Sequence, residues 1–445
     1  MRTDWIERLL RAIYTVAVYL LLPFSLYYLV TRSFRQTAYK PRWSERYGIY
    51  RQRKPLRDVV WIHAVSLGEV NAAAPLVNAL LQDRQDLRLL ITTITPTGSA
   101  RVHELWGDGV EHVYLPYDLP DATGRFLRQF RPSVGLIMET EIWPNLLFSC
   151  HEQGVPLFIL NARLSERSLR GYRVLAPLVA RALQTVNYIA AQSDADAERF
   201  VRLGATPETV HVLGNIKFDV TVPTDTQAFR DQCHAHIAPR KVWIAASTHD
   251  LEEPMVVEMH RALRGEFKDL LLLWAPRHPE RFGLVASQAE AAGFKVGIRS
   301  EHEWPRADDE VFVLDTLGEL SKFFACADVA FVGGSLKPIG GHNLIEPAAV
   351  GVPTVTGKHL HNFAEIAKLL KEAGALEIGQ DAVQVTQALA DILRNPRKAS
   401  SMRDAGLKLI EQGRGALGRY LDVMESSLPA PPATPAPTPH PSQSS

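Results

Sequence analysis

Hydrophobic positions divide the chain into a long apolar run near the N-terminus and an alternating pattern through the middle. Residues 12–30 contain no charged side chain, whereas the middle alternates short apolar runs with amphipathic stretches such as Glu69–Gln82 and Ala195–Arg202. Strands that alternate with helices are typical of βαβ units and a parallel sheet. Right-handed crossovers then cover both faces of the sheet with helices. We therefore expect an α/β protein with a separate N-terminal segment.

The strand pattern runs twice, with a break near residues 215–237, where KFDVTVPTD indicates a linker. The candidate strands before the break are Val59–His63, Leu87–Thr92, His112–Leu115, Ser133–Met138, Leu157–Asn161, Tyr188–Ala191 and Val210–Leu213. Those after it are Val242–Ala246, Leu270–Ala275, Lys295–Gly297, Val311–Leu314, Val329–Val332 and Pro353–Val355. The sequence thus predicts two Rossmann-like domains that face a cleft at the carboxyl ends of their strands, where ligands bind.

These patterns also set the expected boundaries of the domains. We expect a membrane anchor with the start of a basic collar over residues 1–35, a first domain over 36–222 and a second over 223–428. The last segment, 429–445, is rich in proline and poor in apolar residues, so we expect a disordered tail.

The apolar run is long enough to cross a bilayer, which takes about 20 residues. Tyrosines near both ends of the run suit the two membrane interfaces, and Pro23 is tolerated in a membrane helix with a kink. A cleaved signal peptide is disfavoured, because the run is too long and no small-residue cleavage site follows it promptly. The sequence predicts a membrane anchor and leaves open whether it spans the bilayer or lies in the interface.

A basic collar follows the apolar run, with Glu45 as the only acid within it. Its members are Arg32, Arg35, Lys40, Arg42, Arg46, Arg51, Arg53, Lys54 and Arg57. The positive-inside rule places this flank, and the chain after it, in the cytoplasm. Such cations attract anionic head groups, although a solvated basic linker is the alternative.

Composition narrows the class of protein further. The 445 residues suit two or three domains, and 46% hydrophobic with 22% charged residues excludes a mainly disordered, collagen-like or polytopic membrane chain. Lysine plus arginine and aspartate plus glutamate both number 49, so no overall basic field favours nucleic acid. The three cysteines, Cys150, Cys233 and Cys326, lie far apart in the sequence, which argues against a disulfide framework and against a zinc site.

Three motifs of the first half carry candidate chemistry. The segment Ser66-Leu67-Gly68-Glu69 follows the first strand and opens a helix. Glu69 is therefore either a general base or a carboxylate that stabilises the helix N-terminus through the helix dipole. Glu139, in METEIWPN, ends another strand, where acids are costly unless paired or functional; capping is the alternative. Lys217, in GNIKFD, could neutralise a phosphate, although a lone lysine is usually solvated.

The second half repeats the strand–turn–helix arrangement at three places. Arg277, in APRHP, suits a phosphate or carboxylate, and DTLGEL forms a second such turn. The densest glycines are Gly333-Gly334-Ser335 and Gly340-Gly341, where backbone amides could approach a ligand. Glu346 could accept both hydroxyls of a ribose. Three such turns in one domain favour a nucleotide site over plain turns.

Other patterns are set aside or left open. Asp194-Ala195-Asp196 resembles a metal-binding DxD motif, but its place between a strand and a helix favours capping, so we expect no metal site. The absence of a G-x-x-x-x-G-K-[ST] sequence disfavours kinases and ATPases of that type. His249, in STHD, either meets a ligand or lines its turn.

The motifs together resemble the 3-deoxy-D-manno-octulosonic acid (Kdo) transferases of lipopolysaccharide assembly, from the N-terminal anchor to about Glu425. The resemblance rests on SLGEV, METEIWPN, GNIKFD, STH, PRHPER, DTLGEL, FVGGS and GGHNLIEP, in this order. Asp250 departs from the more usual glutamate after STH, and the proline-rich tail has no counterpart. The resemblance implies a GT-B glycosyltransferase with two Rossmann-like domains.

The same resemblance implies the reaction and its residues. The family transfers Kdo from CMP-Kdo to the acylated glucosamine disaccharide lipid that precedes lipid A (lipid IVA), with inversion and without a cofactor. Glu69 matches the catalytic base, and Glu139 and Lys217 match the transition-state stabilisers. The positions that match the CMP contacts are Pro276, Arg277, Leu317, Gly318, Glu319, Asn343, Leu344, Ile345 and Glu346.

The implied location is the bacterial inner membrane, crossed once, with the catalytic domains on the cytoplasmic side and no nucleic acid as partner. One alternative is another membrane-associated GT-B enzyme with a UDP-sugar donor. A second is a nucleotide-binding scaffold without activity, against which Glu69, Glu139 and Lys217 argue. The motifs do not fix the number of Kdo residues transferred, because each transfer would use the same base.

Overall fold

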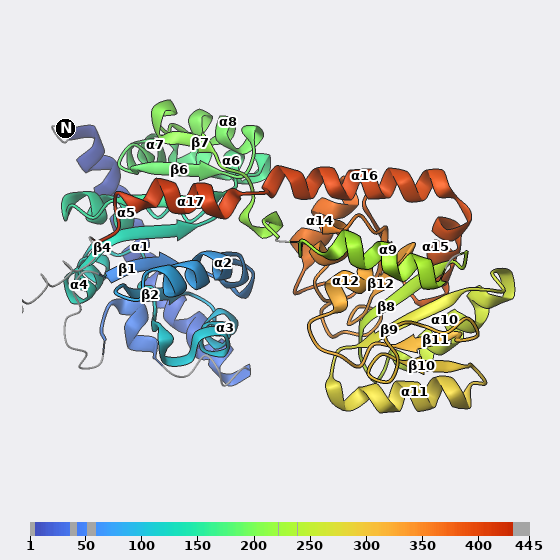
Figure 1. Cartoon of the computed structure of the whole chain (residues 1–445). Coiled ribbons are helices and arrows are strands. Elements are labelled where there is room, and N and C mark those ends of the chain that lie inside the picture. The colour runs from blue at the N-terminus through green and yellow to red at the C-terminus, as the bar shows by residue number, and fades with distance from the viewer. Residues whose placement is uncertain (1–4, 36–41, 51–58, 221, 238, 430–445) are drawn as a thin grey trace, which may run out of the picture. The chain divides into compact units, whose positions relative to one another are not determined.

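The chain divides into two compact units in a computed structural model that describes residues 5–35, 42–50, 59–220, 222–237 and 239–429. Unit 1 comprises Met1–Ile216 and Gly415–Ser445, and unit 2 comprises Lys217–Arg414 (Figure 1). The chain therefore passes between the units twice. The first passage lies near the expected boundary at residue 222, whereas residues 415–428 belong to unit 1 and not to the expected second domain.

Unit 1 contains a seven-stranded parallel sheet with the order β3-β2-β1-β4-β5-β6-β7. Its strands are β1 (Val59–His63), β2 (Arg88–Thr93), β3 (Glu111–Tyr114), β4 (Pro132–Met138), β5 (Leu157–Ala162), β6 (Tyr188–Ala191) and β7 (Val210–Val212). Its helices are α1 (Trp5–Arg35), α2 (Leu67–Asp83), α3 (Pro96–Trp106), α4 (Pro120–Phe130), α5 (Pro144–Glu152), α6 (Glu166–Tyr172), α7 (Ala176–Leu183), α8 (Asp194–Leu203) and α17 (Ala416–Glu425).

Strand β1 shows why this sheet forms. All five of its residues, VVWIH, are buried, as expected for a central parallel strand that helices cover on both faces. Trp61 pairs with Leu90 of β2 and Gly135 of β4. A Cβ atom at Gly135 would lie 2.8 Å from the Trp61 ring and 2.4 Å from Leu157, so the large indole requires glycine beside it.

Unit 2 repeats the architecture with the order β10-β11-β9-β8-β12-β13-β14, again all parallel. Its strands are β8 (Val242–Thr248), β9 (Leu271–Pro276), β10 (Val296–Ile298), β11 (Val311–Val313), β12 (Val329–Val332), β13 (Thr354–Gly357) and β14 (Leu376–Gly379). Its helices are α9 (Thr226–Ile237), α10 (Glu253–Glu266), α11 (Phe282–Ala291), α12 (Leu320–Phe324), α13 (Ile345–Ala349), α14 (Ala364–Glu372), α15 (Ala382–Arg394) and α16 (Pro396–Gly413).

Two elements of unit 2 differ from the sequence-based expectation. Strand β14 was not expected, because LEIG is short and its second and third residues are only half-buried. Helix α9 begins directly after the expected linker KFDVTVPTD and lies within the expected break at residues 215–237, because Cys233 and Ile237 pack into the core beside β8. Tertiary burial, and not a strong amphipathic pattern, therefore stabilises α9.

Helix α17 packs against unit 1 through a buried tyrosine. Tyr420 is 1% exposed and lies in one hydrophobic cluster with residues of β1, β4 and α2. Its hydroxyl donates to the carbonyl oxygen of Gly214 at 2.9 Å and accepts from the amide of Asn161 at 3.1 Å. Arg419 adds a bond of 2.7 Å to the carbonyl oxygen of Leu213. The last helix thus holds the segment that leads out of β7.

Helix α1 has one face against unit 1 and one exposed apolar face. Tyr14 donates to Asp118 at 2.9 Å, Tyr19 donates to Asp121 at 2.6 Å, and Arg11 forms an ion pair with Glu152. On the other side, large apolar residues recur every three or four positions and are exposed: Trp5, Leu9, Ile13, Val16, Leu20, Phe24 and Tyr27. By length and composition, Trp5–Tyr27 is long and apolar enough to cross a membrane.

Only two members of the predicted collar have described side chains, and both belong to the body of unit 1. Arg42 forms an ion pair with Glu45 and donates to the carbonyl oxygen of His112 at 2.7 Å. Arg46 is 4% exposed and donates to the carbonyl oxygen of Ile94 at 2.7 Å. These two cations are therefore structural. The remaining collar side chains, and residues 430–445 of the predicted tail, lie outside the described residues.

We expect Tyr420→Phe to lower the free energy of unfolding by about 1–3 kcal/mol, because the amide of Asn161 and the carbonyl of Gly214 lose a buried partner. Urea unfolding of the full chain in detergent measures the change. Tyr172→Phe, at a partly exposed tyrosine, is the matched control and should shift stability by less than about 0.5 kcal/mol. Equal unfolding midpoints for the two variants would contradict a role of the Tyr420 hydroxyl.

Candidate active site

The predicted site residues follow strands at two special places in the sheets. In unit 1 the strand order reverses between β1 and β4, and in unit 2 it reverses between β8 and β12. At such a switch point the crossover connections leave in opposite directions and open a crevice at the carboxyl ends of the strands. Glu69 follows β1 and Glu139 follows β4. The topology therefore brings these two predicted residues to one crevice of unit 1.

The Glu69 carboxylate folds back on the turn between β1 and α2. It accepts from the amide of Val65 at 2.7 Å and from the hydroxyl of Ser66 at 3.1 Å. A glutamate in the first helical turn that reaches back to an amide resembles a capping box. The helix-terminal role that the sequence left open is therefore present, and it does not exclude reactivity.

Burial and like charge raise the pKa of Glu69 to about 8. Desolvation is the larger cause, followed by the charges of Glu139 and Glu141, while the bonds from Val65 and Ser66 act in the opposite direction. Burial also raises the pKa of Glu141, whose carboxylate accepts from the Trp143 indole at 2.6 Å. Near neutral pH, Glu69 can therefore both lose and take up a proton.

Glu139 lies in a strained backbone conformation. Its φ is +60°, in the left-handed region that non-glycine residues rarely adopt, and its amide donates to the carbonyl oxygen of Leu160 at 2.8 Å. Asn161, at the end of the neighbouring strand β5, also has a positive φ of +52°. Such strain costs about 1–3 kcal/mol per residue and persists where the surroundings fix the geometry, often at active sites.

Lys217 lies in a 3₁₀ turn at Ile216–Phe218 and is the first residue of unit 2. Its side chain is 10% exposed and forms an ion pair with Glu365, which begins the first turn of α14. No sequence pattern predicts this pairing, because the two residues lie far apart in the chain. The ammonium group is thus held in place by a carboxylate and is not a solvated linker charge.

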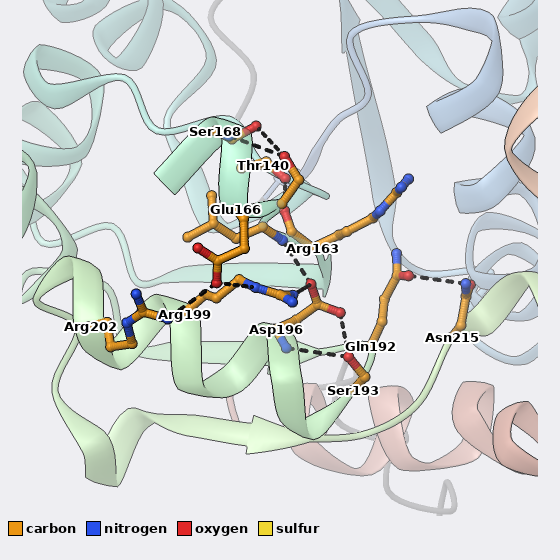
Figure 2. A network of polar contacts seen from close by, with 12 residues as sticks. Thr140, Arg163, Glu166, Ser168, Gln192, Ser193, Asp196, Arg199, Arg202 and Asn215 are labelled. Atoms are coloured by element: carbon orange, nitrogen blue, oxygen red, sulfur yellow. Dashed lines mark hydrogen bonds and ion pairs between the residues drawn. The ribbon is translucent and has the colours of Figure 1, made fainter. Parts of the chain in front are cut away.

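The Asp194-Ala195-Asp196 motif forms a helix cap. Ser193 precedes α8, and its hydroxyl accepts from the amide of Asp196 at 3.3 Å (Figure 2). The Asp196 carboxylate accepts from the amide of Leu164 at 3.0 Å and from Arg199 at 3.3 Å. These contacts confirm the interpretation of the motif as a cap. Within the described ranges, no group of three or more His, Cys, Asp or Glu could hold a metal ion.

Polar contacts hold the segment before Lys217. Asn215 donates to the side-chain oxygen of Gln192 at 3.1 Å (Figure 2). The amide of Ile216 donates to the side-chain oxygen of Asn161 at 3.2 Å. Both contacts lie within unit 1 and come from the ends of β5 and β6. The last residues of unit 1 therefore have a defined conformation.

In unit 2, Arg277 follows β9 and has an exposed side chain. Its amide donates to the carbonyl oxygen of Thr248 at 3.0 Å, which fixes the backbone, while Pro276 is buried at the end of the strand. Among the residues that the structure describes, none forms a hydrogen bond or ion pair with the Arg277 guanidinium. This group is available for an anion.

In the DTLGEL turn, the predicted residue Leu317 is exposed and the predicted residue Glu319 pairs with an arginine. Leu317 is 77% exposed, and Gly318 has a φ of +86°, which suits glycine. Glu319 forms a bidentate pair with Arg299, with a distance of 2.8 Å to Nη2 and 3.1 Å to Nε. Arg299, Thr316 and Glu319 help to line a polar cavity of about 530 Å³.

The NLIE segment combines a polar turn with buried side chains. Asn343 accepts from the amide of Ile345 at 3.0 Å and donates to Glu346 at 2.9 Å, and burial raises the pKa of Glu346. Leu344 is 0% exposed and Ile345 is 8% exposed, because both pack into the core against Val332. Contacts from these two residues to a nucleotide would therefore come from their backbone.

The amides of the Gly333-Gly334-Ser335 turn are already occupied, which corrects the expectation that they approach a ligand. The buried carboxylate of Glu252 accepts from the amides of Gly334 at 2.6 Å, Ser335 at 2.9 Å and Leu336 at 2.8 Å. Gly333 is glycine for a packing reason, because a Cβ atom there would lie 2.8 Å from the carbonyl oxygen of Ser247. A protein carboxylate thus holds this turn.

Sequence reasoning missed three carboxylate or guanidinium partners: Glu252, Arg299 and Glu365. Glu141 lies within the METE motif, where acids at the strand end were expected to be paired or functional. Glu252, Arg299 and Glu365 lie in turns or helix starts with no local pattern that separates them from solvated charges. Only their partners, which are distant in sequence, define them.

Comparison with known proteins identifies the family. Residues 41–220 match the family model described as 3-deoxy-D-manno-octulosonic-acid transferase (kdotransferase). The chain is 38% identical over 421 residues to the 3-deoxy-D-manno-octulosonic acid transferase of Haemophilus influenzae, covering 94% of this chain and 99% of that protein. The chain belongs to the Kdo transferase family. The Bordetella pertussis relative is 39% identical, with 84% of this chain and 88% of that protein covered. Family and enzyme class, expected from the motifs, are thus confirmed.

Solved structures are similar as well. Acinetobacter baumannii MurG has a TM-score of 0.51 at 13% identity and covers 84% of this chain and 100% of that chain. This likeness concerns the fold and agrees with the two parallel α/β units of the expected GT-B class. The C-terminal CMP-Kdo binding domain of WaaA from Acinetobacter baumannii is 33% identical and covers 42% of this chain and 99% of that chain, with a TM-score of 0.40.

We expect Glu69→Gln to stabilise the Kdo transferase at alkaline pH. Because the folded-state pKa of about 8 exceeds the ordinary value of 4.5, the native state loses stability as pH rises between these values. The glutamine keeps an acceptor for the Val65 amide and removes the charge. Relative to the wild type, we expect a gain of about 2–4 kcal/mol at pH 8.5 and little gain at pH 5.

Urea unfolding at the two pH values measures this difference. Glu104→Gln, at an exposed glutamate of α3, is the matched control and should show no pH-dependent gain. A constant stability difference between Glu69→Gln and the wild type from pH 5 to 8.5 would contradict the raised pKa.

Proposed function

We propose that the chain transfers Kdo from CMP-Kdo to the acylated glucosamine disaccharide that precedes lipid A (lipid IVA), with inversion and with Glu69 as general base. The observation that carries this proposal is the Glu69 carboxylate, which follows β1 at the switch point of unit 1 and has its pKa raised to about 8. Family membership supports the Kdo donor, and the site chemistry supports the role of the base.

The carboxylate has the properties that a general base needs. A base acts best when its pKa lies near the working pH, because it then combines availability with proton affinity. The Val65 amide and the Ser66 hydroxyl orient both oxygens of Glu69. In the proposed step, Glu69 takes the proton of a primary sugar hydroxyl, whose oxygen attacks the anomeric carbon of Kdo. The bond from that carbon to the phosphate oxygen breaks, and CMP leaves with the electron pair.

Glu139 and Lys217 are proposed to stabilise the transition state. The anomeric carbon gains positive charge as the bond to phosphate breaks, which a nearby carboxylate stabilises, and the departing phosphate gains negative charge, which a cation stabilises. The fixed backbone of Glu139 and the ion pair of Lys217 with Glu365 support these roles, because preorganised charges need no reorientation during the reaction.

We propose that CMP binds unit 2 through Pro276-Arg277, Leu317-Gly318-Glu319 and Asn343-Leu344-Ile345-Glu346. The exposed guanidinium of Arg277 supports a role in binding the phosphate. The buried side chains of Leu344 and Ile345 support backbone contacts at that segment. Glu346 remains the proposed partner of the ribose hydroxyls.

We further propose that α1 attaches the enzyme to the cytoplasmic face of the bacterial inner membrane, where the acyl chains of the acceptor lie. The exposed apolar stripe on α1 supports contact with lipid. The bonds from Tyr14 and Tyr19, and the ion pair of Arg11, hold the opposite face against unit 1. These contacts favour a helix that lies in the interface over a single crossing of the bilayer.

We expect Glu69→Gln to lower the rate of transfer by about 10²–10⁴-fold, because the amide cannot accept the proton of the hydroxyl. Affinity for CMP should change by less than about twofold, since Glu69 belongs to unit 1 and the proposed CMP residues belong to unit 2. Mass spectrometry of products from CMP-Kdo and a tetraacylated disaccharide measures transfer, with Glu104→Gln as control. Wild-type turnover by Glu69→Gln would exclude this base, and turnover with UDP-sugars would exclude the proposed donor.

We expect the pH profile of kcat/KM to rise with pH and to level off above about 8, because the base acts in its unprotonated form. Glu141→Gln removes a charge that raises the pKa of Glu69, so the midpoint should move to lower pH. Glu104→Gln should leave the midpoint unchanged. An unchanged midpoint in Glu141→Gln would show that the ionisation seen in the profile is not that of Glu69.

A further inference from the structure

Three histidines gather at the carboxyl edge of the sheet in unit 2. His249 follows β8, His278 follows β9 and His342 lies in the long connection after β12. The rings of His249 and His342 lie edge to edge in nearly parallel planes, with centroids 5.0 Å apart and planes 5° apart, and the His278 ring meets His249 edge-on at 5.2 Å. Since the strand order reverses between β8 and β12, the pair of His249 and His342 lies at the switch point of this sheet.

The rings of His249 and His342 share a proton. Their Nε2 atoms are 2.8 Å apart, so one must donate and the other must accept. In the neutral pair, the accepting ring carries its proton on Nδ1, and the donating ring presents a free lone pair there. Within the described parts of the chain, no group hydrogen-bonds to either Nδ1 atom. One added proton would turn both Nδ1 atoms into donors and give the pair a positive charge.

The surrounding protein holds the pair in this geometry. Glu252 accepts from the amide of His249 at 3.2 Å and from the amide of Gly334 at 2.6 Å. The Gly334 carbonyl oxygen in turn accepts from the amide of Gly341 at 2.7 Å, which connects these bonds to the residue before His342. Gly334 also makes room for the pair, because a Cβ atom there would lie 2.7 Å from Cδ2 of His342. The pair is therefore preorganised, and binding an additional group would not require the rings to move.

The charges that face the pair favour an anion. Burial lowers the pKa of His342 to about 4, and His249, Arg277 and His278 lower it further. Burial also lowers the pKa of His249, with Glu252 and Asp250 acting in the opposite direction. Both acids are engaged with backbone amides, Glu252 in the glycine turn and Asp250 with Leu251 at 2.9 Å. An anion placed beside Arg277 and the two rings would raise the pKa of the pair.

We propose that His249 and His342 bind the negative charge of the sugar nucleotide as a pair that takes up a proton when the anion binds. This proposal rests on the proposed transfer from CMP-Kdo, whose charge resides on a phosphate and on the carboxylate of the sugar. Arg277 supplies a permanent cation beside the pair, and the pair supplies a second one that appears only with the ligand. The affinity gained from the pair is thus larger at lower pH.

The test compares the wild type with His249→Gln and His342→Gln in the full chain. Glutamine retains a polar group near Nε2 and removes the titratable ring and its Nδ1 atom. Calorimetry gives Kd for CMP and for cytidine from pH 6 to 8.5, and turnover gives KM for CMP-Kdo. Because the ligand titrates identically in every sample, the ratio of variant to wild-type affinity reports the pair alone. His236→Gln, at an exposed histidine of α9, is the control.

We expect each variant to weaken binding by about tenfold at pH 6 and by less than about twofold at pH 8.5, with cytidine affinity unchanged. An effect on both CMP and CMP-Kdo assigns the phosphate, and an effect on CMP-Kdo alone assigns the sugar carboxylate. A ratio independent of pH, or equal losses for cytidine and CMP, would overturn the proposal and indicate a structural pair. Because binding of CMP does not require transfer, this outcome is separate from failure of the proposed reaction.

Discussion

Parallel strand order is the constraint on which the chemistry of both units depends. When all strands point the same way, the connections that follow them emerge at one edge, and only the place where the order reverses leaves that edge open. In unit 1 this place lies between β1 and β4, and in unit 2 between β8 and β12. Glu69 and Glu139 occupy the first, and His249 and His342 occupy the second.

The same edge concentrates unfavourable conformations and charges. Glu139, Asn161 and Ser247 have positive φ values although none is glycine, and each follows or ends a strand at the carboxyl edge. Burial and two nearby carboxylates destabilise the charged form of Glu69, which raises its pKa. These costs are of the size that a core of fully buried residues such as Trp61 and Trp243 can offset. The stability of the sheet core therefore offsets the energetic cost of the strained and charged residues at its carboxyl edge.

Polar groups at these edges both build the turns and carry the proposed chemistry. Glu69 fixes the turn after β1, and the pairing of Lys217 with Glu365 holds an ammonium group that would otherwise be solvated. Glu252 only builds a turn, because its carboxylate already accepts hydrogen bonds from three amides of the glycine turn. A glycine-rich motif is thus not by itself a free anion site.

The sequence by itself determined the two parallel α/β units, nearly all strands and the family, because buried parallel strands are continuous apolar runs and the motifs occur in a fixed order. It also determined that Glu69 opens a helix and that the Asp194-Ala195-Asp196 motif belongs to a helix cap, since both depend on neighbours within a turn. Only tertiary structure decided the return of α17 to unit 1, strand β14, the Glu252 clamp and the shared proton of His249 and His342. Each of these depends on contacts between residues far apart in the chain, which no local periodicity encodes.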